Sequence, residues 1–206
     1  MKNRFLFVLT LLLAFIKVNS QTCFNDCKQR SLAAWENLQK KGITSTDSAL
    51  SCDQKITDQL KGCQFPNVQL NKLGGGSFKI QELKGNVVFV HLWFVNCATC
   101  IAEMPMINKL NEEYANQPVK FLFISFDDQQ KLLDFFKKRG NSTSIQTFMD
   151  QKTLESTFCL LSGYPMNFVL DKNGKVIDVW TEENPEGDKQ QGFYDKVKAL
   201  IDINLK

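Results

Sequence analysis

The sequence predicts an α/β protein with a central mixed β-sheet flanked by helices, preceded by a helical hairpin that carries cysteines. Two runs, residues 87–94 and 119–126, are apolar at nearly every position, as expected of central strands covered on both faces. Amphipathic segments alternate with these runs, which is the pattern of parallel βαβ units. Near the C-terminus, Asn173-Gly174 separates two short apolar runs and favours a tight hairpin. The sheet should therefore begin with parallel strands and end with an antiparallel pair.

The first twenty residues have the pattern of a secretory signal peptide. Lys2 and Arg4 precede an apolar run at 5–16, and cleavage is placed after Ser20. This run is too short to span a bilayer, which takes about 20 residues. No second run of spanning length follows, and the residues before Cys23 disfavour a lipid anchor there. We therefore expect an exported protein, periplasmic or extracellular, with no stable membrane insertion after cleavage.

The charge balance argues against a polyanionic partner. The full chain has 25 basic and 22 acidic residues, a formal net charge of +3. The predicted signal segment holds three of the bases (Lys2, Arg4 and Lys17) and no acid, which leaves 22 of each sign in the mature chain. A nucleic acid or an anionic membrane surface is therefore not an expected partner. Export also implies that thiols tend to be oxidised.

Residues 21–65 differ in composition from the rest of the chain and are predicted to form a small helical appendage. Leu32, Trp35 and Leu38 are spaced as on a helix covering 31–40, and a second helix should run from about residue 45 to Gly62. Neither helix has enough apolar surface to fold alone, so disulfides should staple the hairpin to the main domain. The candidate structural cysteines are Cys23, Cys27, Cys52 and Cys63.

Four cysteines allow three pairings. Cys23 and Cys27 would lie about 6 Å apart along a helix axis, whereas Cys52 and Cys63 would lie about 16 Å apart. Two straight antiparallel helices cannot match both spacings, so Cys63, which follows Gly62, should lie outside regular helix. We expect Cys23 or Cys27 to bond Cys52 and the other to bond Cys63; a free or partly reduced pair is the alternative.

Residues 66–206 are predicted to form the main domain. Its first two strands should pair around the glycines at 74–76, and Pro105 should interrupt or kink the helix after the first buried strand. Gly140 should end a later amphipathic helix. The predicted elements are strands 67–70, 78–81 and 87–94, helix 97–114, strand 119–126, helix 128–139 with Leu132, Leu133, Phe135 and Phe136 inward, strand 147–149, a short helix to 160, strands 167–170 and 176–181, and helix 192–203.

Cys97 and Cys100 form a Cys-x-x-Cys pair, which could bind a metal, form a structural disulfide or carry out redox chemistry. A structural metal site needs four ligands, but this pair and His91, the one histidine of the chain, supply three. A copper site of these three residues is therefore the weaker alternative, and no metal is expected. A structural staple across so short a gap would remove little chain entropy. His91 lies within a predicted buried strand, where a histidine is more often a hydrogen-bonded core residue than a metal ligand.

The position of the pair favours redox chemistry. Cys97 should lie where a central strand ends and a helix begins, and unpaired N–H groups there favour a thiolate over a thiol. Such sites lower the thiol pKa below its ordinary value of about 8.5. Cys100, nearly one turn on, can attack a mixed disulfide formed at Cys97. Cys97 is therefore the predicted nucleophile and Cys100 the predicted resolving thiol.

Two motifs, VVFVHLWFVNCATCIAEMPMINKL and GYPMNFVLDKNGKV, together with the signal peptide, resemble the exported TlpA-like branch of thioredoxin-fold thiol–disulfide oxidoreductases, within the redoxin/AhpC-TSA-related superfamily. The resemblance covers about residues 66–205 and implies a thioredoxin-like fold. It implies that Cys97 and Cys100 are the redox pair, that Glu103 handles protons near the buried thiol, and that Pro165 is a cis-proline facing the disulfide. A solvated Glu103 and a trans Pro165 are the alternatives.

The resemblance also implies a substrate-contacting set: Trp93, Asn96, Ala98, Thr99 and Tyr164. Simple core packing is the alternative for Trp93. Asn96 stands where many relatives have tryptophan, and Thr99 replaces a frequent proline, so the redox potential cannot be carried over. Cys159, six residues before Pro165, is expected to be unpaired and buried; a third active-site thiol is the alternative.

The predicted function is that of an exported oxidoreductase acting on disulfides or dithiols of other exported proteins. The resemblance implies a reductase supplied by a membrane-bound electron donor, with no cofactor beyond the Cys97–Cys100 disulfide. A peroxiredoxin-like peroxidase is one alternative, although Thr99 directly precedes Cys100 and does not give its Thr-x-x-Cys spacing. A non-catalytic binding module with a static disulfide is the other.

Overall fold

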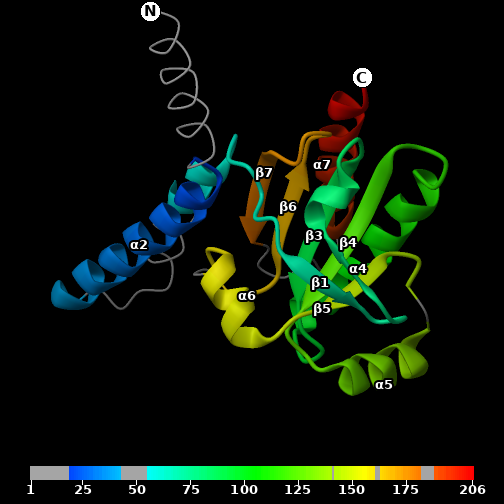
Figure 1. The fold of residues 1–206 in the computed structure, drawn as a ribbon, viewed down its shortest axis with the longest axis horizontal. Helices are drawn as coiled ribbons and strands as arrows, with labels where there is room; N and C mark the ends of the chain where they lie inside the picture. The colour runs from blue at the N-terminus through cyan, green and yellow to red at the C-terminus, as the bar shows by residue number, and fades with distance from the viewer. Residues whose placement is uncertain (1–18, 43–54, 141, 161–162, 182–187) are drawn as a thin grey trace, which may run out of the picture.

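The computed structural model describes residues 19–42, 55–140, 142–160, 163–181 and 188–206. Its centre is one seven-stranded sheet in the order β2-β1-β5-β4-β3-β6-β7 (Figure 1). The predicted mixed α/β class is confirmed. The strands are β1 (Gln69–Lys72), β2 (Ser77–Lys79), β3 (Val87–Trp93), β4 (Val119–Ser125), β5 (Ile145–Phe148), β6 (Met166–Leu170) and β7 (Val176–Thr181).

Strand β3 lies between β4 and β6 in the sheet. It pairs in parallel with β4 and antiparallel with β6, and all of its residues are buried. Strands β4 and β5 are also parallel, whereas β6 and β7 form the predicted antiparallel hairpin. The predicted order of parallel strands followed by an antiparallel pair is therefore confirmed.

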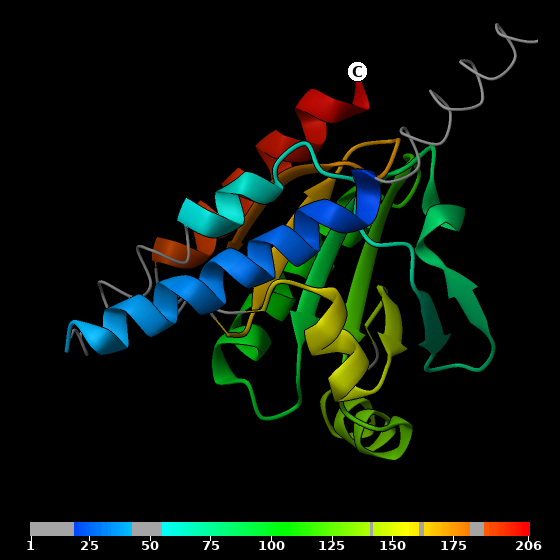
Figure 2. The same ribbon diagram turned by 60° about the vertical axis from the view of Figure 1, so that its left-hand side comes forward.

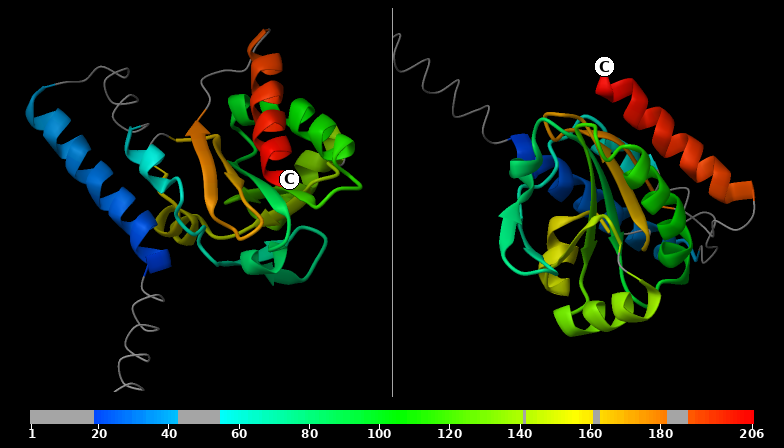
Figure 3. Two further views of the ribbon diagram at one scale, coloured as in Figure 1. Left: turned by 90° about the horizontal axis from the view of Figure 1, so that it is seen from above. Right: turned by 90° about the vertical axis from the view of Figure 1, so that its right-hand side faces the viewer.

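Helices cover both faces of this sheet (Figure 3). Alternate residues of β3 face opposite sides: Val88 and Val90 pack in the cluster reached by α2 and α6, while Val87 and Phe89 pack in the cluster reached by α4, α5 and α7. This double burial explains why β3 is apolar on both faces. The helices are α2 (Asn19–Lys40), α4 (Ala98–Glu113), α5 (Gln129–Arg139), α6 (Gln151–Thr157) and α7 (Asp188–Leu205), with short 3₁₀ helices η1 (Asp58–Leu60) and η2 (Ile80–Leu83).

Helix α2 lies against the α6 side of the domain, and its C-terminal half runs past the domain edge (Figure 2). Its buried face is Phe24, Cys27 and Ser31, whereas Leu32 and Trp35 are exposed. The Phe24 ring sits 5.8 to 6.4 Å from three rings of the main core, which belong to Phe65, Phe158 and Phe168. The appendage therefore shares the core of the main domain instead of forming one of its own.

Two disulfides fix α2 to the domain. Cys23 bonds Cys63, which lies after Gly62 and outside regular helix as expected. Cys27 bonds Cys159, whose sequence separation is 132 residues. The expectations that Cys27 or Cys23 bonds Cys52 and that Cys159 is unpaired are therefore wrong. The reason is that Phe158-Cys159 lies directly under α2, next to the Phe24 ring; Cys52 falls outside the described residues.

Other differences are local. Helix α2 begins well before residue 31, and of the second predicted appendage helix the structure describes residues 55–57 and η1. Leu133 on α5 is exposed, not inward. Gly140 ends α5 with a φ of 92°, as its sequence position predicts. The predicted signal peptide falls on residues 1–20, of which 1–18 are outside the described part, and no described helix is long and apolar enough to cross a membrane.

Candidate active site

The Cys-x-x-Cys pair lies where β3 gives way to α4. Cys97 is the N-cap residue of α4, and its Sγ accepts a hydrogen bond from the backbone N–H of Cys100 at 3.2 Å. The two cysteines are joined by a disulfide. A sulfur at an N-cap receives the unpaired N–H groups of the first turn, so negative charge on Cys97 is stabilised after reduction.

The two sulfurs differ in accessibility. Cys97 is 5% exposed and Cys100 is fully buried. Around Cys97, Asn96 and Ala98 are exposed and Thr99 is half-buried, with its Oγ1 3.4 Å from the Cys97 Sγ. Cys97 therefore lies next to exposed side chains, whereas Cys100 has no exposed surface.

The loop before β6 lies beside the cysteine loop. The Tyr164–Pro165 bond is cis, as the family resemblance implies, and Pro165 is buried while Tyr164 is half-buried. The Tyr164 ring contacts Phe94 and Phe126, with centroids 5.4 and 5.5 Å away. These three half-buried rings connect the ends of β3 and β4 to the start of β6 at one edge of the sheet.

Trp93 lies beneath the site and not on its surface. Its side chain is fully buried, and its ring packs 5.2 Å from Phe135 and 5.9 Å from Phe136 on α5. The expectation that Trp93 contacts substrate is therefore corrected: it supports the cysteine loop through packing, the alternative reading of this residue.

Glu103 is fully buried, which excludes a solvated carboxylate in this structure. Its Oε2 accepts a hydrogen bond from the Nδ2 of Asn167 at 3.0 Å and lies 3.4 Å from the Nδ1 of His91. Burial lowers the pKa of His91 to about 4, against opposing contributions from Asn167 and the Cys100 backbone. His91 is therefore neutral at pH 7.

Asp127 anchors the chain just before the cysteines. Its buried carboxylate accepts a hydrogen bond from the Val95 N–H at 2.6 Å and another from the Ser125 hydroxyl at 3.2 Å. Lys131 of α5 pairs with its other oxygen. Because Val95 is two residues before Cys97, Asp127 fixes the path of the active-site loop.

Replacing Asp127 with alanine is expected to destabilise the protein by about 2 kcal/mol, because it leaves the Val95 N–H without its charged acceptor. For a chain of this size the melting temperature should fall by roughly 4 to 8 °C. Asp127→Asn is the control, since the amide oxygen can still accept from Val95. An equal fall in melting temperature in both variants would show that the ion pair to Lys131, and not the hydrogen bond from Val95, stabilises the loop before Cys97.

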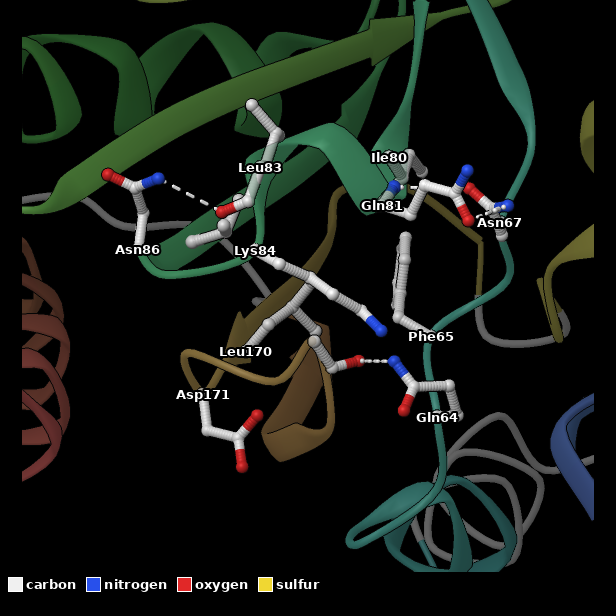
Figure 4. Close-up of a pocket in the computed structure, with 12 residues that line it drawn as sticks. Gln64, Phe65, Asn67, Ile80, Gln81, Leu83, Lys84, Asn86, Leu170 and Asp171 are labelled. Carbon is white, nitrogen blue, oxygen red and sulfur yellow. Dashed lines mark hydrogen bonds between the residues drawn. The ribbon is translucent and has the colours of Figure 1, made fainter. Parts of the chain in front are cut away.

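A cavity of about 290 Å³ lies at the other end of β3, away from the sulfurs (Figure 4). It is bordered by Val88 near the start of β3 and by Leu170 at the end of β6. Two of its amides pair with neighbouring carbonyls: the Gln64 amide donates to the Gly174 carbonyl at 2.9 Å, and the Asn86 amide donates to the Leu83 carbonyl at 3.0 Å. None of the residues that line the cavity is one of the two cysteines or Glu103.

Within the described ranges, no group of three or more histidine, cysteine or acidic side chains could hold a metal ion. The chemistry of this edge of the sheet consists of two cysteines at a helix N-terminus, with a buried carboxylate behind the second one. That fold and that pair define a thiol–disulfide oxidoreductase of the thioredoxin type.

The chain belongs to the redoxin family, whose model matches residues 60–197. A thioredoxin-like protein of Bacillus subtilis strain 168, YneN, is 30% identical over 140 residues, 67% of this chain and 81% of the relative. The thiol-disulfide oxidoreductase ResA of Bacillus cereus is 26% identical over 136 residues, 66% of this chain and 78% of the relative. The TlpA-like resemblance seen in the motifs is thus confirmed.

Among solved structures, the thioredoxin domain of a thiol-disulfide oxidoreductase from Bacteroides vulgatus superposes with a TM-score of 0.56 at 22% identity. The match covers 68% of this chain and 97% of that domain. At this level of identity the similarity establishes the thioredoxin-like fold.

Sequence reasoning missed two features of the site. Asp127 follows β4, whose carboxyl end meets the same sheet edge as that of β3, and this position could have marked it. The partnership of His91, Asn167 and Glu103 had a partial signal, because His91 and Asn167 are polar residues within buried strands. Their meeting point depended on the sheet register, which pairs His91 with Asn167.

Proposed function

We propose that this protein is exported and exchanges electrons with disulfides of other exported proteins through Cys97 and Cys100, acting as a reductase. The observation that carries the proposal is the asymmetry of the pair: Cys97 caps α4, is 5% exposed and lies between the exposed Asn96 and Ala98, whereas Cys100 is fully buried one turn further on. A pair in which one sulfur lies nearer the surface than the other suits a two-step exchange.

In the first step the Cys97 thiolate attacks a substrate disulfide, forms a mixed disulfide with one substrate sulfur and releases the other as a thiolate. In the second step Cys100 loses its proton and attacks the Cys97 Sγ. The second substrate thiol leaves, and the Cys97–Cys100 disulfide forms. The substrate gains two electrons, and the protein loses two.

The proposed site consists of the pair and its borders. Glu103 takes the proton of Cys100, and the backbone before Pro165 pairs with an extended substrate segment. Exposure supports Asn96 and Ala98 as substrate contacts, and the Thr99 hydroxyl beside the Cys97 sulfur supports Thr99. The half-buried Tyr164, which contacts Phe94, is proposed as a further contact. The cysteine pair is the only redox group that the proposed reaction needs.

Export is proposed from the signal-like segment 1–20, which would leave a mature chain of appendage 21–65 and thioredoxin-like domain 66–206. The disulfides Cys23–Cys63 and Cys27–Cys159 support an oxidising compartment, because such bonds seldom persist in a reducing cytosol. A reductase working there needs a supply of electrons, for which we propose a membrane-bound dithiol donor.

Equilibration with glutathione redox buffers tests the direction of electron flow. A reductase should have a potential close to that of thioredoxin, about −270 mV, so that exported disulfides accept its electrons. The fraction of oxidised Cys97–Cys100 is measured by alkylation and mass spectrometry of the active-site peptide. A potential near that of DsbA, about −120 mV, would instead make the protein a disulfide donor.

A further inference from the structure

Three polar side chains from three elements meet beneath the first turn of α4. His91 on β3, Asn167 on β6 and Glu103 on α4 are all fully buried. The His91 Nδ1 lies 2.8 Å from the Asn167 Oδ1 and 3.4 Å from the Glu103 Oε2. The Asn167 Nδ2 donates to that same carboxylate oxygen at 3.0 Å. Buried polar groups are costly unless they satisfy one another, so this arrangement is specific.

The hydrogen-bond directions identify the proton on His91. An ionised Glu103 accepts from the Asn167 Nδ2, which leaves the Asn167 Oδ1 facing His91, where it can only accept. In this arrangement the His91 Nδ1 carries the hydrogen and directs it toward Asn167 and Glu103. Reversing the amide would turn its oxygen toward the carboxylate, which is unfavourable.

The cluster is adjacent to the resolving thiol. Glu103 is three residues after Cys100, on the same face of α4, and the backbone of Cys100 lies close enough to the His91 ring to favour its protonation. From the other elements packed on β3, β4 presents the Phe123 ring at 4.8 Å from the imidazole and β6 presents Asn167. Helix α7 meets β3 two residues earlier, at Phe89. The ionisable groups that these elements bring to His91 are thus Glu103 and the thiol of Cys100.

We propose that His91 is a positioning residue for proton transfer at Cys100, because its Nδ1–H, together with the Asn167 amide, favours the carboxylate form of Glu103 behind the thiol. This rests on the proposed dithiol exchange. In the resolving step the Cys100 S–H gives its proton to Glu103, and the resulting thiolate attacks the Cys97 Sγ and displaces the bound thiolate. His91 stays neutral throughout, since burial opposes its charged form.

A single-turnover reaction of the reduced protein with 5,5′-dithiobis(2-nitrobenzoate) separates the two steps. Attack by Cys97 releases the first coloured thiolate, and resolution by Cys100 releases the second. His91→Phe should leave the first phase unchanged. It should move the pH midpoint of the second phase up by about one unit, which makes that phase roughly tenfold slower below the midpoint, because the carboxylate loses a donor and binds its proton more tightly.

Two variants control this result. His91→Asn places an amide N–H where Nδ1 stands and should restore the wild-type midpoint. Glu103→Gln should remove the pH dependence that the carboxylate imposes on the second phase. A wild-type midpoint in His91→Phe, or an unchanged second phase in Glu103→Gln, overturns the proposal. Release of only one thiolate by the wild-type protein would instead overturn the dithiol exchange itself.

A measurement on the unmutated protein keeps the test independent of folding. Because the chain has a single histidine, the imidazole signals in a ¹H–¹⁵N correlation spectrum belong to His91 alone. At pH 7 the Nδ1-protonated neutral ring is expected. An Nε2-protonated ring overturns the proposal, because Nδ1 would then have no hydrogen to give Glu103.

Discussion

Replacing Cys97 with serine is expected to abolish disulfide reduction, whereas replacing Cys100 should stop the reaction halfway. Serine at position 97 cannot open a disulfide, so turnover of insulin in a coupled dithiothreitol assay should fall by roughly 10³-fold or more, as for other lost nucleophiles. Serine at position 100 leaves the first attack intact but cannot release the substrate. The Cys100→Ser protein should therefore accumulate as mixed disulfides.

Non-reducing electrophoresis with a disulfide-containing partner separates the two variants. Cys100→Ser should give a more slowly migrating band that disappears after treatment with dithiothreitol, and Cys97→Ser should give no such band. The double variant is the control for adducts at other cysteines. A trapped band in Cys97→Ser would mean that the roles are reversed, and no band in either would favour a static bridge over an exchanging pair.

Removing the Cys27–Cys159 disulfide should produce the largest loss of stability. The bond closes a separation of 132 residues, and the chain-entropy treatment gives about 4 to 5 kcal/mol for a loop of that length. The double variant Cys27→Ala, Cys159→Ala should therefore melt roughly 8 to 20 °C lower than the wild type. Differential scanning calorimetry of the oxidised proteins measures this.

The active-site bond is the matched control, because it closes a separation of only 3 residues. Cys97→Ala with Cys100→Ala should change the unfolding free energy by no more than about 1.5 kcal/mol. If both double variants melt at the same temperature, the long-range bond does not constrain the unfolded chain. The helix α2 would then be held by its contacts with Phe65, Phe158 and Phe168.

Much of the domain could be predicted from local patterns. Strands β3 and β4 both begin at the predicted residue, because each is a mostly apolar run that follows a residue unsuited to a strand, Asn86 or Pro118. The Cys97 N-cap followed from its place at the end of such a run. Short elements were less well placed: β1 and β2 differ from prediction by one or two residues, since a strand of three or four residues with a single buried side chain leaves little pattern to read.

What the sequence could not predict were contacts between distant segments. Cys159 gave no sign of its partner, because its pairing depends on the angle at which α2 crosses the domain. The Glu103–Asn167–His91 cluster likewise needed the register of β3 against β6 and the rotation of α4 above them. A polar residue in a buried strand indicates that it has a hydrogen-bond partner, but not which residue that partner is.

The length of chain that each disulfide closes has a consequence for a protein whose own chemistry is thiol exchange. Cys23–Cys63 and Cys27–Cys159 close separations of 40 and 132 residues, whereas Cys97–Cys100 closes a separation of 3. A disulfide that stabilises the fold is in turn stabilised against reduction by the fold, and this effect grows with the length of the closed loop. The two bonds that hold α2 should therefore have lower reduction potentials than the active pair. A reductant strong enough to reduce Cys97–Cys100 can then leave both structural bonds oxidised, so that the protein is recharged without loosening its own fold.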